Sequence, residues 1–396
     1  MLIFNQKKLD TQEQTFIAKT ISGLEEILAG ELTLLGAKEV KTIKRAVSFT
    51  GDKKLLYEAN LWCRTALRIL KPLYSFTVTN NDDLYKNIYD YAWDTIFTVD
   101  QTFAIDSIIN DSAFTHSHFV SQKVKDAVAD KFRSISGTRP TVNIENPDIR
   151  INIHIYKNQC DVSLDSSGES LHKRGYRYAA GLAPMSEVLA AGLVMLSSWD
   201  KHSNFVDPMC GSGTILIEAA LIAQNIAPGS FKKSFSFMKW KDYDADLWQK
   251  IKNLAVEKET PIKCSIIGSD YSYEEIKNAK KNVAQAKLQK NILLQIAAYD
   301  TFSPPEGGGV MIMNPPYGER LQEDDIIAFY KSIGDGLKKR YGGYDAWIIS
   351  SDMNALKFIG LKPTRKIPVF NGPLECRFMK FSIYAGSKRD KFIEQE

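Results

Sequence analysis

The stretch FVDPMCGSGT, residues 205–214, decides the fold of this 396-residue chain. It begins with apolar residues, reaches an acid at Asp207 and continues through glycines at 211 and 213. Glycine lets the backbone turn tightly and approach a ligand closely, so the pattern indicates a strand that ends in a turn. Apolar residues then recur at helical spacing from Thr214 to Ala223. The stretch therefore predicts a strand, a glycine-bearing turn and a helix.

The turn does not have the pattern of a phosphate-binding loop. Its glycines do not form GxGxxG, and no Lys-Ser or Lys-Thr pair follows them. A dinucleotide or a nucleoside triphosphate is therefore disfavoured, whereas the carboxylate of Asp207 suits a cationic group such as the amino group of a methionine moiety. The loop resembles the S-adenosylmethionine (SAM) site of a class I methyltransferase. On this resemblance we expect SAM contacts from Pro184, Asp207, Pro208, Cys210, Gly211, Gly213 and Thr214.

Two further acids follow strand-like runs. SIIGSD ends in Asp270, and LLQIAAYD ends in Asp300. Open α/β sheets bind ligands at the carboxyl ends of their strands, so we expect Asp270 to bind both ribose hydroxyls and Asp300 to receive the adenine amine. A single acid of this kind is more typical of an Asp that caps the next helix. Three acids at successive strand ends favour the ligand site.

The run VMIMNPPY, residues 310–317, places a polar loop directly after a buried strand. Proline fixes φ, removes a backbone donor and restricts the residue before it, so Pro315 and Pro316 stiffen this loop. The amide oxygen of Asn314 and the carbonyl of Pro315 can accept both hydrogens of an exocyclic NH₂ group, while Tyr317 stacks on the ring. We expect these four residues to form the catalytic loop, with Asn314 also beside SAM. The alternative is a proline-rich turn that merely ends a strand, and the tetrapeptide alone does not decide between the two.

The loop favours an amine over a carbon atom as the methyl acceptor. Carbon methylation of pyrimidines normally needs a cysteine nucleophile near the site. No cysteine occurs in the Asn314 loop. Cys210 lies in the glycine-bearing turn, and Cys376 is better explained as a small buried hydrophobe in the last hairpin.

Composition is that of an ordinary globular protein, with 44% hydrophobic and 25% charged residues. A net charge of +4 leaves any RNA contact to local patches. The five cysteines are scattered without a CxxC pair, which predicts reduced thiols, no metal site and a cytoplasmic location. His116 and His118 lack a third ligand and do not change this expectation. The start of the chain lacks a secretory apolar core, and the longest apolar segment is shorter than the roughly 20 residues that cross a bilayer.

Strands and helices alternate after residue 182, as a doubly wound α/β sheet requires. We expect strands at 204–207, 265–270, 292–297, 310–314 and 345–350, helices at 214–223, 245–258, 272–287 and 324–341, and a closing hairpin at 362–369 and 375–384. The first half has an α+β pattern. There we expect strands at 16–21, 39–44, 67–77, 102–108, 148–156 and 159–165, and helices at 23–35, 53–62, 82–89 and 119–134.

The stretch RPTVNIENPDIRINI, residues 139–153, resembles the central signature of a THUMP domain, an RNA-binding module. LHKRGYR, residues 171–177, and APM, residues 183–185, resemble the join between THUMP and methyltransferase domains. The chain is thus similar over nearly its whole length to THUMP-containing RNA guanine-N2 methyltransferases, both the N-terminal half of RlmL-type enzymes and stand-alone YpsC-like enzymes. RlmL-type enzymes continue into a second methyltransferase domain, whereas this chain stops at Glu396, so only the guanine-N2 activity is expected.

The resemblance implies a fold, a cofactor and a substrate. The fold class is α/β: a class I, Rossmann-like methyltransferase domain preceded by an α+β region with a THUMP domain. The expected reaction moves a methyl group from SAM, leaving S-adenosyl-L-homocysteine (SAH), to a guanine N2 in 23S ribosomal RNA, free or in an assembly intermediate. The expected parts are a ferredoxin-like α+β subdomain (1–65), THUMP (66–166), a linker (167–183) and the methyltransferase domain (184–396).

Local basic residues are the expected RNA contacts. Lysines and arginines recur at helical spacing after residue 118, and LHKRGYR adds more cations between the two halves. The alternative is a solvated charged face. The expected RNA-binding residues are Lys123, Lys131, Arg139, Lys173, Arg174 and Arg177.

Two other classes of function stay open. A methyltransferase acting on a glutamine side-chain amide, or on adenine N6, uses a similar Asn-Pro-Pro-Tyr loop, although neither needs an RNA-docking module. An RNA-binding assembly factor without turnover is the second alternative. The presence of Asp207, Asp270 and Asn314 together argues against a silent site.

Overall fold

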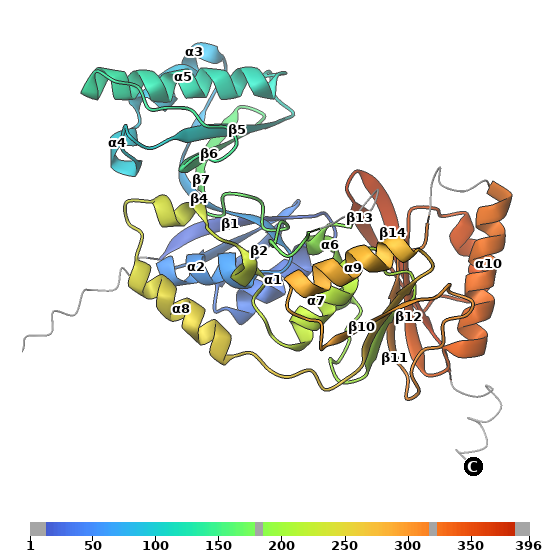
Figure 1. Ribbon diagram of the computed structural model, residues 1–396. Helices are drawn as coiled ribbons and strands as arrows, with labels where there is room; N and C mark the ends of the chain where they lie inside the picture. The colour runs from blue at the N-terminus through green and yellow to red at the C-terminus, as the bar shows by residue number, and fades with distance from the viewer. Residues whose placement is uncertain (1–12, 179–184, 317–322, 385–396) are drawn as a thin grey trace, which may run out of the picture. The chain divides into compact units, whose positions relative to one another are not determined.

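The computed structural model describes residues 13–178, 185–316 and 323–384 (Figure 1). The chain folds as two compact units. The described residues of the first unit are 13–20, 28–171 and 232–254, and those of the second unit are 21–27, 172–178, 185–231, 255–316 and 323–384. None of the helices in these described residues is both long and apolar enough to cross a membrane.

The second unit is built on a seven-stranded sheet with the order β10-β9-β8-β11-β12-β14-β13. Strands β8 to β12 are parallel where they pair, and β14 runs antiparallel to both β12 and β13. The order reverses at β8, which pairs with β9 on one side and β11 on the other. The strands are β8 (Asn204–Asp207), β9 (Ile266–Asp270), β10 (Ile292–Ile296), β11 (Gly309–Met313), β12 (Tyr344–Ser350), β13 (Arg365–Asn371) and β14 (Leu374–Ser382).

Helices cover both faces of this sheet (Figure 1). Helices α7 and α9 lie on one side and α10 lies on the other. The apolar stripe of α10, with Ile333 and Leu337, belongs to the same buried cluster as Met311 and Met313 of β11. The sheet is therefore doubly wound, as predicted. The elements are α6 (Glu187–Leu196), α7 (Thr214–Ala223), η1 (Pro228–Phe231), α9 (Tyr273–Gln285), α10 (Glu323–Arg340) and η3 (Ala355–Ile359).

The first unit contains a second seven-stranded sheet, with the order β2-β3-β1-β4-β7-β6-β5. Its strands are β1 (Gln14–Thr20), β2 (Lys38–Ile43), β3 (Ala46–Gly51), β4 (Ala66–Thr77), β5 (Phe103–Asn110), β6 (Ile149–Tyr156) and β7 (Gln159–Asp165). The remaining elements are α1 (Glu25–Leu34), α2 (Lys53–Trp62), α3 (Asn81–Asp90), α4 (Trp93–Ile96), α5 (Ser117–Ser136), η2 (Ser236–Lys239) and α8 (Ala245–Glu257).

Three elements of the first unit, β3, α4 and η2, were not predicted. Strand β3, with the sequence AVSFTG, pairs with both β1 and β2. Its alternation of apolar and polar residues is a local strand signal that the prediction missed. The short helix α4 buries Trp93, whose indole Nε1 donates to the carbonyl of Ile88 at 2.7 Å. Helices α4 and η2 have four residues each, too few to show a helical periodicity.

Residues 232–254 lie between elements of the second unit in sequence but pack into the first unit. The Phe237 ring stacks on Tyr57 with centroids 4.3 Å apart, and Trp248 meets Phe237 edge-on at 5.2 Å. Phe235 and Phe237 are both buried. These rings are therefore core residues and are not available to stack on the bases of a nucleic acid.

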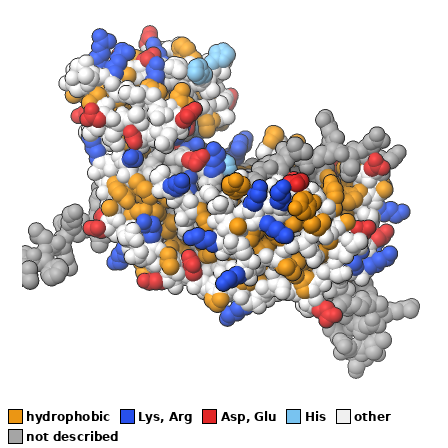
Figure 2. Space-filling model, in the orientation of Figure 1, with side chains coloured by type: hydrophobic (Ala, Val, Ile, Leu, Met, Phe, Trp, Pro, Cys, Tyr) orange, Lys and Arg blue, Asp and Glu red, His pale blue; other side chains and the backbone are white. Residues whose placement is uncertain are grey.

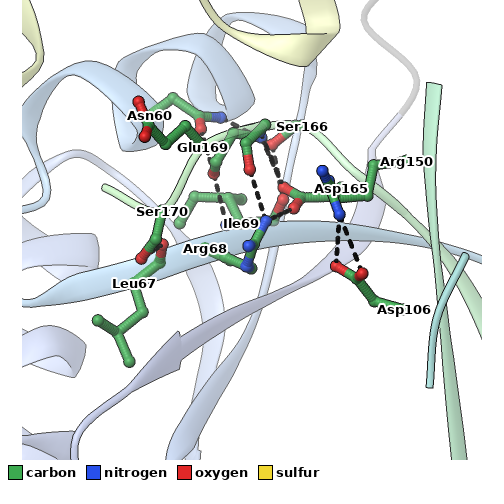
Figure 3. Close-up of polar contacts among 12 residues, drawn as sticks. Asn60, Leu67, Arg68, Ile69, Asp106, Arg150, Asp165, Ser166, Glu169 and Ser170 are labelled. Atoms are coloured by element: carbon green, nitrogen blue, oxygen red, sulfur yellow. Dashed lines mark hydrogen bonds and ion pairs between the residues drawn. The ribbon is translucent and has the colours of Figure 1, made fainter. Parts of the chain in front are cut away.

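A buried polar network fixes the join between β4 and β7 (Figure 3). The Arg68 guanidinium forms an ion pair with Asp165, and the backbone N–H of Ser167 donates to Asp165 Oδ1 at 2.8 Å. Asp165 is buried, and its burial raises the pKa of the carboxyl group even though Arg68 opposes that shift. Next to it, Arg150 Nη1 donates to both carboxylate oxygens of Asp106 at 2.9 and 3.1 Å. In this network each charged side chain is paired with an opposite charge, which offsets the cost of burying it.

We expect Arg68→Met to lower the free energy of unfolding by about 3 kcal/mol, because it leaves Asp165 buried without a cation. Urea unfolding followed by fluorescence measures the change. Arg377→Met is the control, since it breaks an exposed pair with Glu375 and should cost under about 1 kcal/mol. Equal losses in the two variants would contradict this account, as would a double variant Arg68→Met/Asp165→Asn that recovers no stability.

Candidate functional site

The glycine-bearing turn between β8 and α7 is the first part of the site. Gly213 has φ of 83°, in the left-handed region that favours glycine, and a Cβ there would lie 3.3 Å from the Cβ of Ala279. At Gly268 in β9, a Cβ would lie 2.2 Å from Leu216 Cδ1 of α7. Glycine at both positions therefore lets α7 and its first turn lie directly against β9 and α9.

Two buried acids stand at the carboxyl ends of the neighbouring strands β8 and β9. The backbone N–H of Met209 donates to Asp207 Oδ1 at 3.2 Å. Asp270 accepts from the N–H of Gly211 at 3.0 Å through Oδ2 and from the N–H of Ser272 at 3.0 Å through Oδ1. The structure thus brings together two acids that lie more than sixty residues apart in the sequence. It also fixes the carboxylate of Asp270 against the glycine-bearing turn.

Asp207 lies in an environment that shifts the pKa of its carboxyl group. It is 1% exposed, and burial raises the pKa of its carboxyl group to about 8, with a further contribution from the negative charge of Asp270. A cation next to this carboxylate would favour the ionised form and offset the cost of burial. The position therefore suits a ligand with an ammonium group.

Two residues lie where the adenine of SAM is expected. Asp300 was predicted, and Tyr271 was not. Asp300 lies beyond β10 and is exposed to solvent. Tyr271 follows Asp270 directly, and its side chain is 80% exposed although it is a large aromatic ring. The spacing pattern did not single out Tyr271. Its position could have indicated it, because Tyr271 is an aromatic residue directly after the acid at a strand end. The planar faces of a base need an apolar contact at such a place.

The expected catalytic loop begins where β11 ends at Met313. The side-chain Oδ1 of Asn314 is buried and accepts no hydrogen bond within the described part of the chain. A donor placed next to this oxygen would satisfy an acceptor whose burial otherwise costs about 1–3 kcal/mol. Pro315 is buried, and the hydroxyl of Tyr330 donates to the carbonyl of Pro316 at 3.5 Å. Two residues assigned to the site from sequence, Tyr317 and Pro184, lie outside the described residues.

Arg174 was expected to contact RNA, and its burial shows that this assignment was wrong. It is 1% exposed and its Nε lies 3.4 Å from Glu218 Oε1 of α7. The hydroxyl of Tyr176 donates to the same carboxylate oxygen at 2.9 Å. The guanidinium therefore neutralises a buried acid and presents no surface to a phosphate.

Arg177 also has partners inside the second unit. Its Nε donates to Glu187 Oε1 at 2.8 Å, and its Nη2 donates to the carbonyl of Met185 at 2.8 Å and to Thr214 Oγ1 at 3.2 Å. These bonds join the first turns of α6 and α7. The arginine positions the glycine-bearing turn, which is a structural reason for its presence that the spacing of cations in LHKRGYR did not reveal.

The other expected RNA contacts lie at or near the surface. On α5, the ammonium groups of Lys123 and Lys131 lie 5.1 and 5.3 Å from the ring centroids of Tyr85 and Tyr89. Arg139 forms an ion pair with Asp130, and Lys173 is exposed. Their role in RNA binding stays a prediction.

Family comparisons match three consecutive segments of the chain. Residues 174–380 match the RMKL-like methyltransferase domain, residues 78–165 match the THUMP domain, and residues 15–70 match the RlmL ferredoxin-like domain.

Individual relatives extend over most of the chain. A putative RNA methyltransferase of Synechocystis sp., slr0064, is 42% identical over 372 residues, which cover 93% of this chain and 97% of that protein. The ribosomal RNA large subunit methyltransferase K/L of Methylococcus capsulatus is 38% identical over 93% of this chain, but the match covers 51% of that protein. The chain thus spans about half the length of this K/L relative.

Solved structures show the same fold over nearly the whole chain. The crystal structure of SMU.472, a putative methyltransferase complexed with SAH, is 29% identical and superposes with a TM-score of 0.86 over 95% of this chain and 100% of its own. A structure from Listeria monocytogenes, named a predicted N6-adenine-specific DNA methylase, is 31% identical with a TM-score of 0.83 over 95% of this chain and 97% of its own.

We expect the ligand-free protein to lose stability as the pH rises from about 4 to about 8. In the unfolded chain Asp207 has an ordinary pKa of about 3.9. Between that value and its folded pKa of about 8, the folded state holds a proton that the unfolded state has released. Raising the pH through this window therefore lowers the free energy of unfolding.

Urea unfolding across the same pH window, compared with Asp207→Asn, isolates this contribution. The variant has no titrating group at position 207, so its free energy of unfolding should fall less steeply with pH. Equal slopes in the two proteins would show that Asp207 ionises with an ordinary pKa.

Proposed function

Because the chain belongs to the RMKL-like methyltransferase family and includes a THUMP domain, we propose that this SAM-dependent RNA methyltransferase acts on the exocyclic N2 of a guanine in 23S ribosomal RNA. The observation that supports an amine as the methyl acceptor is the buried Oδ1 of Asn314, which follows β11 and accepts no hydrogen bond from the described residues. The names of the K/L relatives support ribosomal RNA as the substrate. Such a substrate places the enzyme in the cytoplasm.

The residues around the turn fit SAM. The carboxylate of Asp207, buried and short of a cation, would hold the amino group of the methionine moiety. Asp270, fixed by the N–H groups of Gly211 and Ser272, would accept from the ribose hydroxyls. Asp300 would receive the adenine amine, and the exposed ring of Tyr271 would cover one face of the base.

Close packing of the turn supplies the remaining contacts. The turn and the start of α7 include Pro208, Cys210 and Thr214. Cys210 is a buried thiol, and burial raises its pKa well above the usual value. That shift keeps the thiol neutral, so Cys210 packs without acting as a nucleophile. When bound, SAM supplies a methyl group that its sulfonium has already activated.

The catalytic loop then has to position an amine. The Oδ1 of Asn314 and the carbonyl of Pro315 accept the two N2 hydrogens, which reduces the delocalisation of the nitrogen lone pair into the ring. Tyr330 supports the loop through the carbonyl of Pro316 and is itself tied to Ser350 at 2.8 Å. Positioning and exclusion of water supply most of the acceleration in this scheme, and the amine loses its proton after the methyl group has moved.

Asp270→Ala should weaken SAH binding by about tenfold or more, the loss expected when hydrogen bonds to a charged group disappear. Isothermal titration calorimetry measures the affinity. Asp335→Ala removes an exposed acid from α10 and should leave SAH affinity unchanged. An undiminished affinity in Asp270→Ala would remove Asp270 from the ribose site.

Nucleoside mass spectrometry of ribosomal RNA tests the proposed reaction. Cells that lack this protein should lose N2-methylguanosine at one position of 23S RNA, and the intact gene should restore it. Asn314→Ala should not restore it, because loss of one preorganised polar contact slows methyl transfer by about 10²-fold or more.

The same variant should bind SAH with nearly the affinity of the original protein, which separates loss of chemistry from loss of the cofactor. An unchanged level of N2-methylguanosine in the deletion strain would overturn the proposal. Loss of N6-methyladenosine in its place would move the target to adenine.

A further inference from the structure

Helix α9 carries an exposed group of lysines, of which Lys277 also forms an ion pair with Glu274 at 3.3 Å. Residues 276–290 include five lysines and no acidic residue. Lys277, Lys280 and Lys281 are all exposed, and their spacing of three and four residues places them on one face of α9. Acids occur in this helix only in the first turn, at Glu274 and Glu275, where they suit the helix dipole. We name the Lys277, Lys280 and Lys281 face, together with Tyr273, the α9 patch.

Aromatic rings alternate with these cations. Tyr273 is 63% exposed, and the ammonium of Lys277 lies 5.9 Å from its ring centroid. Tyr178 is 67% exposed, and the ammonium of Lys281 lies 5.5 Å from its ring centroid. The two exposed rings and the lysines beside them form one mixed aromatic and cationic surface. Figure 2 shows Lys and Arg side chains gathered beside hydrophobic ones over α9.

The patch borders a shallow hollow of about 350 Å³ between α9 and the end of the edge strand β10. Tyr273, Lys277 and Lys280 line it on the helix, and Ile296, which is about half exposed, lines it on the strand. The two buried acids, Asp207 and Asp270, do not line this hollow, although Ile296 of β10 is the register partner of Asp270 of β9.

Asn282 connects the patch to the glycine-bearing turn. This buried side chain of α9 donates through Nδ2 to the carbonyl of Ser212 at 2.9 Å, and its Oδ1 accepts from the N–H of Tyr178 at 2.9 Å. The helix begins three residues after Asp270, with Ser272 as its N-cap. The backbone of α9 is thus anchored to the glycine-bearing turn and follows the acid at the end of β9.

We propose that the α9 patch binds a single-stranded segment of the substrate RNA, next to the nucleotide that enters the catalytic loop. Lysines attract the phosphates, and exposed tyrosines stack on unpaired bases, which is the combination that single-stranded RNA readers use. Net positive charge without acids over residues 276–290 matches a polyanion rather than a neutral peptide. This assignment rests on the proposed RNA methyltransferase function and names the part of the catalytic unit that holds the strand.

The test compares the original protein with Lys277→Gln/Lys280→Gln/Lys281→Gln on a fluorescein-labelled single-stranded RNA, by anisotropy over a range of salt concentrations. Each lost phosphate contact on a single strand lowers the slope of log K against log salt by ~0.7. The triple variant should therefore bind about tenfold or more weakly, with a slope smaller by about 2. The control, Lys331→Gln/Lys338→Gln/Lys339→Gln, removes the same charge from exposed positions on α10 and should leave both quantities unchanged.

Tyr273 tests the stacking part separately. Tyr273→Ala should weaken binding by about tenfold, and Tyr273→Phe should restore it because stacking needs the ring and not the hydroxyl. SAH affinity by calorimetry should stay constant in all these variants.

RNA affinity and salt slope equal to those of the original protein in the triple variant would overturn the proposal for α9, while N2-methylguanosine in ribosomal RNA would still test the methyl-transfer function independently. Equal loss in the α10 control would also overturn it, because net charge and not the patch would then explain binding. Loss of SAH affinity in the triple variant would contradict the separation of the patch from the cofactor site.

Discussion

Parallel strands expose their carboxyl ends at one edge of a sheet, and in the second unit the strand order reverses at β8. Because the connections leave β8 and β11 in opposite directions, the carboxyl ends of β8, β9 and β11 lie at the topological switch point, where open α/β sheets bind their ligands. Asp207, Asp270 and Asn314 occupy those three ends. Every chemical feature of the site depends on this one arrangement of the backbone.

Burial at these strand ends leaves two polar groups without a full set of partners among the described residues. The same desolvation that raises the pKa of Asp207 to about 8 makes a cationic ligand group a suitable partner for that carboxylate. The Oδ1 of Asn314 accepts no hydrogen bond from the part of the chain that the structure describes. In the proposed reaction the amino group of the methyl donor meets Asp207, and the amine of the substrate meets Asn314.

The role of each cation in this chain depends on its surroundings in the fold and not on its spacing in the sequence. Arg174 and Arg177 belong to one basic run, yet the first neutralises the buried Glu218 and the second joins the first turns of α6 and α7. The sequence did not indicate a binding surface at the lysines of α9, because a lysine-rich helix face is common. Only the exposed tyrosines and the hollow beside β10 distinguish them from a solvated surface. Charge by itself therefore does not distinguish a buried, structural arginine from an exposed cation in this chain.

The sequence by itself determined the strands and the helices α7, α9 and α10 of the second unit within a few residues, and the three polar strand ends, because periodicity, glycine and proline act on the local backbone. Its motifs also indicated the family. Tertiary structure alone decided that residues 232–254 pack into the first unit and which arginines are buried. These outcomes depend on contacts between residues far apart in the chain, which no local pattern encodes.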